Sequence, residues 1–116
     1  MNLLNLIKKY NLHDSYFESV IYSNEKHQVE MNINFAFWMQ EWYNNNIPEN
    51  GIITILFTDV LEYICPSNID WEQISIIQTT VNNDIIKFAL LNDITNEFLE
   101  IIIKCKNVSV IHSYKD

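Results

Sequence analysis

The stretch QVEMNINFAF, residues 28–37, alternates apolar and polar side chains, with Ala36 the one small apolar residue at an even position. Its odd positions are all apolar: Val29, Met31, Ile33, Phe35 and Phe37. Successive side chains of a strand point to opposite faces, so we expect a half-buried β-strand with one face in the core. A pairing shift of one residue would place five apolar side chains in water, so the register should be well specified.

The rest of the chain predicts an antiparallel sheet or sandwich around this strand. Residues 2–10 are expected to form a short amphipathic helix, because Leu3, Leu6, Ile7 and Tyr10 share one helical face. The further strands are expected at residues 16–22, 52–57, 72–81, 84–91, 98–104 and 108–112. Residues 38–43 fit a helical turn or an irregular loop, and residues 58–64 fit a strand extension or a bend. We therefore predict a mainly β (β-rich α+β) fold of six or seven strands in a single domain, residues 1–116.

Composition supports a packed globular chain. Apolar residues make up 48% of the 116, and nineteen isoleucines favour strands. One glycine and two prolines leave the turns to sixteen asparagines, since asparagine tolerates positive φ. The sequence contains no apolar run of about 20 residues and no signal-peptide pattern. The two cysteines lack metal-type spacing, so we expect reduced thiols in a cytoplasmic protein.

Negative charge is unevenly distributed along the chain. The net charge is −8, arginine is absent, and residues 27–86 contain no lysine. That interval holds eight acids: Glu30, Glu41, Glu49, Asp59, Glu62, Asp70, Glu72 and Asp84. Such a chain repels nucleic acid and anionic membranes, whereas a basic protein would be attracted to it. Solubility alone is the simpler explanation of the same charge.

The tetrapeptide Leu12-His13-Asp14-Ser15 is the first candidate site. His13 and Asp14 could act as a general base and its orienting carboxylate. Neighbouring side chains of an extended segment point in opposite directions, however, and the sequence has no Gly-x-Ser-x-Gly motif. We therefore expect a structural role, with Asp14 accepting backbone hydrogen bonds and His13 packed against the sheet. No catalytic residue and no enzymatic activity are predicted.

Metal binding is not indicated. His13, His27 and His112 show none of the short spacings of metal-binding histidines. Asp70, Glu72 and Asp84 do not match a calcium-binding loop. We predict no metal and no cofactor.

Residues 35–43, FAFWMQEWY, combine five aromatic residues with one acid. Tryptophan and tyrosine often dominate binding energy at protein interfaces, although core aromatics are also common. Whether Trp38 and Trp42 are core or exposed stays open at this point. The predicted partner-binding residues are Trp38, Glu41, Trp42, Tyr43, Glu49 and Glu62.

The chain resembles a group of small bacterial domains with an N-terminal His-Asp-Ser signature. The matching elements are the helix, Leu12-His13-Asp14-Ser15, the alternating strand, and Leu56-Phe57-Thr58-Asp59-Val60. The group is similar to the immunity protein 50 family and relatives of unknown function. This resemblance implies a non-catalytic protein that binds and blocks a cognate toxin. A module that binds a small apolar ligand in the concave face of the sheet is the alternative, and nothing positive indicates an enzyme.

Overall fold

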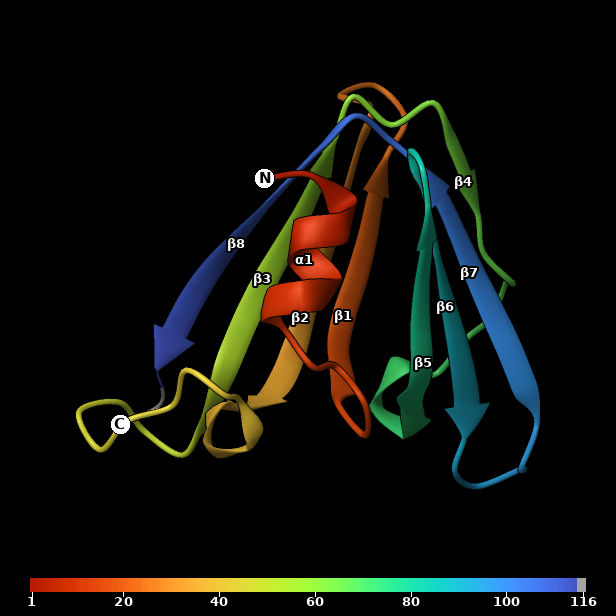
Figure 1. Ribbon diagram of the computed structural model, residues 1–116. Coiled ribbons are helices and arrows are strands. Elements are labelled where there is room, and N and C mark those ends of the chain that lie inside the picture. Colours follow the sequence, from red (N-terminus) through yellow and green to blue (C-terminus); the bar gives the residue numbers. More distant parts are fainter. Residues whose placement is uncertain (115–116) are drawn as a thin grey trace.

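The alternating segment forms strand β2 (Gln28–Ala36) in the computed structural model, which describes residues 1–114 (Figure 1). Strand β2 pairs in antiparallel fashion with β1 (Tyr16–Ser23) and with β3 (Asn50–Thr58). Val29, Met31, Ile33, Phe35 and Phe37 are all at most 2% exposed, which confirms the predicted core face. Phe37 itself begins a short 3-10 helix, η1 (Phe37–Met39), so the strand ends one residue earlier than expected.

Eight antiparallel strands form one open sheet within residues 1–114, in the order β4-β7-β6-β5-β1-β2-β3-β8. The remaining elements are α1 (Leu3–Lys9), β4 (Glu62–Ile64), η2 (Trp71–Gln73), β5 (Ile74–Asn82), β6 (Ile85–Asn92), β7 (Phe98–Lys104) and β8 (Asn107–Tyr114). The predicted mainly β class and N-terminal helix are confirmed. The predicted number of six or seven strands is too low, because the three-residue strand β4 was not recognised.

Of residues 58–64, only Thr58 extends β3, and the chain bends away from Asp59 onward. Asp59 adopts a left-handed conformation with φ of 53°, which ends β3 at Thr58. The chain then turns to β4, whose Glu62 and Ile64 pair with Lys104 and Ile102 of β7. Asp59 thus lies where the chain leaves β3 for the other half of the sheet.

The sheet folds back on itself. Strands β1 and β5 join only at the pair Tyr16 and Ser75. The rings of Phe57 on β3 and Phe88 on β6 are nevertheless 6.2 Å apart, although three strands lie between β3 and β6 in the sheet. A flat sheet would separate these strands by about 19 Å, at about 4.8 Å per strand. The two halves therefore face each other across a common core, and α1 lies beside them (Figure 1). The buried Leu3 and Leu6 of α1 belong to this core.

Asparagine provides several of the turns, as the composition predicted. Asn68, Asn83 and Asn96 have positive φ, a conformation in which Asn and Asp are enriched. The only glycine of the chain, Gly51, does not have positive φ and lies inside β3 opposite Phe35. Its backbone conformation therefore does not require glycine.

Candidate functional site

Negative charge gathers at one end of the sheet. Because the strands are antiparallel, their connections collect at two ends, and residues 11–16, 36–50, 70–75 and 91–98 share the lower end in Figure 1. We call these four segments the acidic end. They contain no lysine and seven exposed carboxylates: Asp14, Glu41, Glu49, Asp70, Glu72, Asp93 and Glu97.

The opposite end of the sheet has a mixed charge. Its connections, residues 23–28, 58–62, 82–85 and 104–107, carry four acids and three lysines: Glu25, Asp59, Glu62, Asp84, Lys26, Lys104 and Lys106. The lysine-free interval of the sequence is divided between the two ends: Glu41, Glu49, Asp70 and Glu72 lie at the acidic end, whereas Asp59, Glu62 and Asp84 lie at the opposite end. Lys8 and Lys9, in the last turn of α1, come just before the first segment of the acidic end.

Gln40 holds the β2–β3 connection in place. Its side chain is 7% exposed, and its Oε1 accepts a hydrogen bond from the Asn11 backbone N–H at 2.9 Å. Its Nε2 donates to the carbonyl oxygens of Asn11 and Ala36, both at 3.1 Å. The connection is thereby tied to the segment between α1 and β1. Sequence reasoning missed Gln40, because one amide within an aromatic run gives no recognisable pattern.

Trp42 anchors the same connection to the body of the protein. Its Nε1 donates to the Lys9 carbonyl oxygen at 2.8 Å, and its ring stacks on His112 of β8. Tyr10 meets the Trp42 ring edge-on, with centroids 5.7 Å apart. Trp42 and Tyr43 are both half-buried, so these two predicted partner-binding residues pack largely against the protein itself.

Trp38 and Met39 face solvent, in contrast to Trp42. Trp38 is 55% exposed and Met39 is 38% exposed. The Trp38 backbone N–H donates to the Glu49 carbonyl oxygen at 3.1 Å, which fixes the two sides of the connection to each other. Glu41 and Glu49 are exposed in the same segment. The structure thus brings together three of the predicted partner-binding residues: Trp38, Glu41 and Glu49.

Glu62 does not belong to this surface, which corrects the predicted grouping. It lies on β4 and pairs with Lys104, at the end of the sheet opposite to Glu41 and Glu49. The nine residues of β3 alone separate the two ends by about 30 Å. Sequence proximity to the other acids was misleading, because β3 carries the chain across the whole molecule between them.

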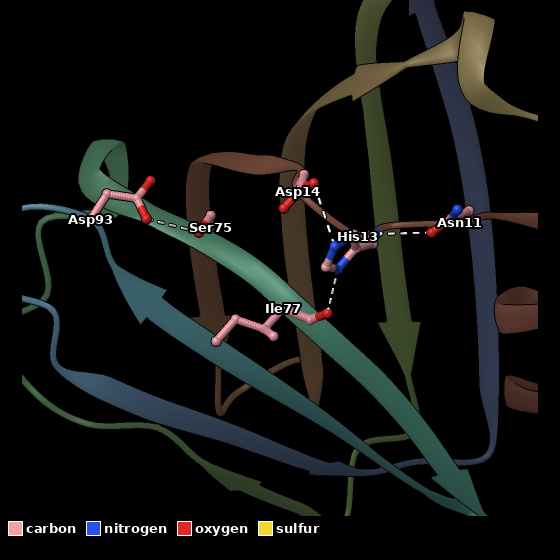
Figure 2. Close-up of polar contacts among 6 residues, drawn as sticks. All are labelled: Asn11, His13, Asp14, Ser75, Ile77 and Asp93. Carbon is pink, nitrogen blue, oxygen red and sulfur yellow. Dashed lines mark hydrogen bonds and ion pairs between the residues drawn. The ribbon is translucent and has the colours of Figure 1, made fainter.

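His13 and Asp14 contact each other at the acidic end, contrary to expectation (Figure 2). His13 Nε2 lies 3.4 Å from Asp14 Oδ2, and the two side chains are 54% and 74% exposed. Asp14 has a φ of 64°, so the segment is not extended and the neighbouring side chains can meet. The predicted burial of His13 is therefore wrong. The predicted role of Asp14 is wrong as well, because no backbone N–H group within residues 1–114 donates a hydrogen bond to its carboxylate.

The main chain of this tetrapeptide nevertheless has a structural role. The Asp14 N–H donates to the Ile76 carbonyl oxygen, and the Ile76 N–H donates to the Ser15 carbonyl oxygen, both at 2.9 Å. Ser15 itself is 6% exposed. These bonds connect the start of β1 to β5, beside the junction of the two halves of the sheet.

Both ring nitrogens of His13 face oxygen atoms. Nδ1 donates to the Ile77 carbonyl oxygen at 2.6 Å, and Nε2 faces the Asp14 carboxylate (Figure 2). A general base needs a ring nitrogen directed at the proton it removes. Within residues 1–114, neither ring nitrogen of His13 is directed at a serine or cysteine side chain.

Asp93 braces the junction between β1 and β5. It accepts hydrogen bonds from the hydroxyls of Tyr16 and Ser75, which are the two residues paired at that junction. Figure 2 shows the contact between Ser75 and Asp93. The hydrogen bond to the Asp93 carboxylate, with a smaller contribution from burial, raises the pKa of Tyr16. Asp93 lies in a polar turn, and no local sequence pattern indicates its hydrogen bonds to two residues that are distant in the chain.

A pocket of about 200 Å³ opens at the acidic end beside His13 and Asp14. It lies between the segment that follows α1, the end of β2 and the start of β3. Its lining residues are Asn11, His13, Asp14, Ser15, Asn34, Phe35, Ala36, Met39, Asn50 and Gly51.

Within residues 1–114, no group of three or more His, Cys, Asp or Glu side chains is placed to hold a metal ion. Nor is any helix of this part of the chain long and apolar enough to cross a membrane. Both cysteines are free. Burial raises the pKa of Cys65, and burial together with Asp84 raises that of Cys105 to about 11, so both thiols stay protonated at neutral pH.

Comparison with protein-family models, with curated proteins and with solved structures finds no match to this chain. The resemblance carried by residues 12–15 and 56–60 therefore stays a prediction. The acidic end and its pocket are the features from which a function can be proposed.

Proposed function

We propose that this protein is a non-catalytic binding protein that holds a basic protein against its acidic end. One observation carries the proposal: the connections at one end of the sheet carry seven exposed carboxylates and no lysine, and one of these connections exposes Trp38 and Met39. Like charges gathered on one surface steer an oppositely charged partner towards it. Desolvated aromatic and thioether groups then supply binding energy at the centre of the contact.

The partner class follows from the sequence resemblance. We infer an immunity protein of a bacterial toxin system, working in the cytoplasm, whose bound toxin is blocked from its own substrate. A toxin that acts on nucleic acid needs a basic surface, and the acidic end would compete for that surface. The ring nitrogens of His13, both directed at oxygen atoms, support a role without catalysis.

A small-ligand-binding module is the second candidate. A groove of about 580 Å³ between β4 and β7 favours it, since small-molecule sites usually measure about 300–1,000 Å³. The groove lies at the edge of the sheet, however, and the concave face expected to hold the ligand is filled by buried rings such as Phe57 and Phe88. The acidic end is the better supported site.

The direct test is to purify this protein with the product of the adjacent gene and to titrate one against the other. We expect a one-to-one complex whose formation abolishes the toxin's activity in stoichiometric amounts. A complex that leaves that activity unchanged would rule out the immunity role. Failure to bind any neighbouring gene product, together with saturable binding of an apolar ligand in the β4–β7 groove, would favour the second candidate.

A further inference from the structure

The pocket beside His13 and Asp14 has the size of a single side chain. Its volume of about 200 Å³ is below the range of about 300–1,000 Å³ that is usual for small-molecule sites. It opens at the acidic end, where the proposed partner would lie. A projecting side chain of that partner is therefore a better match for the pocket than a free metabolite.

The walls of the pocket suit an aliphatic chain. Phe35, which is 2% exposed, and Met39, which is 38% exposed, provide apolar surface. Gly51 also lines the pocket, although its backbone does not need glycine. Glycine within a strand often marks a place where another group approaches closely. Its missing Cβ leaves room at the pocket and beside Phe35.

The rim of the pocket offers hydrogen-bond acceptors. The Asp14 carboxylate is 74% exposed, and its contact with His13 Nε2, at 3.4 Å, uses only part of its accepting capacity. Asn50, which is exposed, also lines the pocket, and its side-chain amide has a carbonyl oxygen that can accept a hydrogen bond. Apolar surface from Phe35 and Met39 beside a carboxylate matches arginine, whose aliphatic stem carries a planar group of five N–H donors.

Building on the proposed function, we infer that this pocket receives one arginine side chain of the basic partner. The guanidinium donates to the Asp14 carboxylate, and the aliphatic stem lies against Met39 and Phe35. Trp38, the residue before Met39, then packs against the surface around that arginine. The pocket thus provides specificity within a surface whose other carboxylates act mainly at long range.

The test uses N-acetyl-L-arginine amide as the probe and N-acetyl-L-citrulline amide as its neutral analogue of similar shape. Backbone amide resonances are followed by NMR during titration of the intact protein. We expect the arginine amide to shift the resonances of His13, Asp14 and Gly51 in a saturable way, and the citrulline amide to leave them unchanged. Equal shifts from both probes would overturn the inference.

Two variants and one control locate the binding. Asp14→Asn should weaken arginine amide binding by about tenfold or more, the usual effect of losing a hydrogen bond to a charged group. Glu97→Gln removes an exposed carboxylate of the same end that does not line the pocket, and should bind as the wild type does. Gly51→Ala keeps every charge but reduces the space, and should also weaken binding. If Asp14→Asn and Glu97→Gln have the same effect, the arginine is held by general charge attraction and the inference fails.

The two proposals can fail separately. If the arginine amide does not bind but the neighbouring gene product still binds in a salt-dependent manner, the pocket inference fails and the proposed function stands. If the arginine amide binds in the pocket and no basic protein engages the acidic end, the immunity role fails instead.

Discussion

The indole of Trp42 stacks on the imidazole of His112, with ring centroids 5.6 Å apart and planes inclined by 16°. This contact joins the β2–β3 connection to the edge strand β8, although Trp42 and His112 are 70 positions apart in the chain. The Tyr10 hydroxyl, just after the end of α1, forms a hydrogen bond with His112 Nε2 at 2.7 Å. The Tyr10 ring meets the rings of Trp42 and His112 edge-on. The cluster therefore fixes the segment that presents Trp38.

Trp42→Ala should destabilise the protein. Full truncation of a buried tryptophan costs about 3–5 kcal/mol, and because Trp42 is half-buried we expect about 2 kcal/mol. Urea unfolding monitored by circular dichroism measures this loss. Trp38→Ala is the matched control, because that side chain is 55% exposed and should change the free energy of unfolding by less than about 0.5 kcal/mol. Equal destabilisation by the two variants would contradict the assigned roles.

Trp38→Ala should instead affect partner binding. Truncation of a central interface tryptophan commonly costs about 2 kcal/mol or more, which corresponds to a dissociation rate raised roughly 30-fold. Surface plasmon resonance with the immobilised partner separates the two rate constants, and the association rate should change little. An unchanged dissociation rate would remove Trp38 from the interface.

Gln40→Ala should cost about 2 kcal/mol of stability, because it leaves the Asn11 N–H and two carbonyl oxygens without their partner. Gln78→Ala is a suitable control, since Gln78 is exposed on β5. Urea unfolding of the two variants gives the comparison. If the Gln40 variant were as stable as the Gln78 variant, these hydrogen bonds would contribute nothing net to folding.

Stability should fall in mildly acidic solution through His112. Desolvation, with a smaller effect of Lys9, lowers the pKa of His112 in the folded protein below its ordinary value of 6.5. The unfolded chain then binds more protons between the two pKa values, so stability is fully present above about pH 6.5 and declines as the pH falls below it. His112→Phe keeps a ring in the cluster but cannot titrate. Urea midpoints at several pH values should show a smaller decline for this variant, and identical declines would contradict the assignment.

The local pattern of the sequence was sufficient for most strands but not for their arrangement in space. The alternation in residues 28–37 predicts both β2 and its buried face, because each side chain follows from the period of two. Strand β4 has three residues and exists through its pairing with β7, so no local pattern could reveal it. The fold-back of the sheet depends on contacts such as Phe57 with Phe88, which are set by packing rather than by any one segment.

The candidate site was predicted only in part for similar reasons. The lysine-free interval contains four of the seven carboxylates of the acidic end, and Trp38, Glu41 and Glu49 are exposed in one connection. The positive φ of Asp14 reversed the expected relation to His13, and that conformation is not visible in the sequence. The pocket combines residues from three separate segments, so it appears only once the chain is folded.

The association rate with the basic partner, measured by stopped flow at ionic strengths below and above the physiological value, tests the central claim most directly. Glu41→Lys and Glu62→Lys change the net charge equally, but they act at opposite ends of the sheet. If the acidic end is the binding surface, the wild-type rate falls steeply with salt, and Glu41→Lys is slower and less salt-dependent. Glu62→Lys should then stay close to the wild type. A rate independent of salt, or a Glu62→Lys variant as slow as Glu41→Lys, would contradict the proposal that the partner binds at the acidic end.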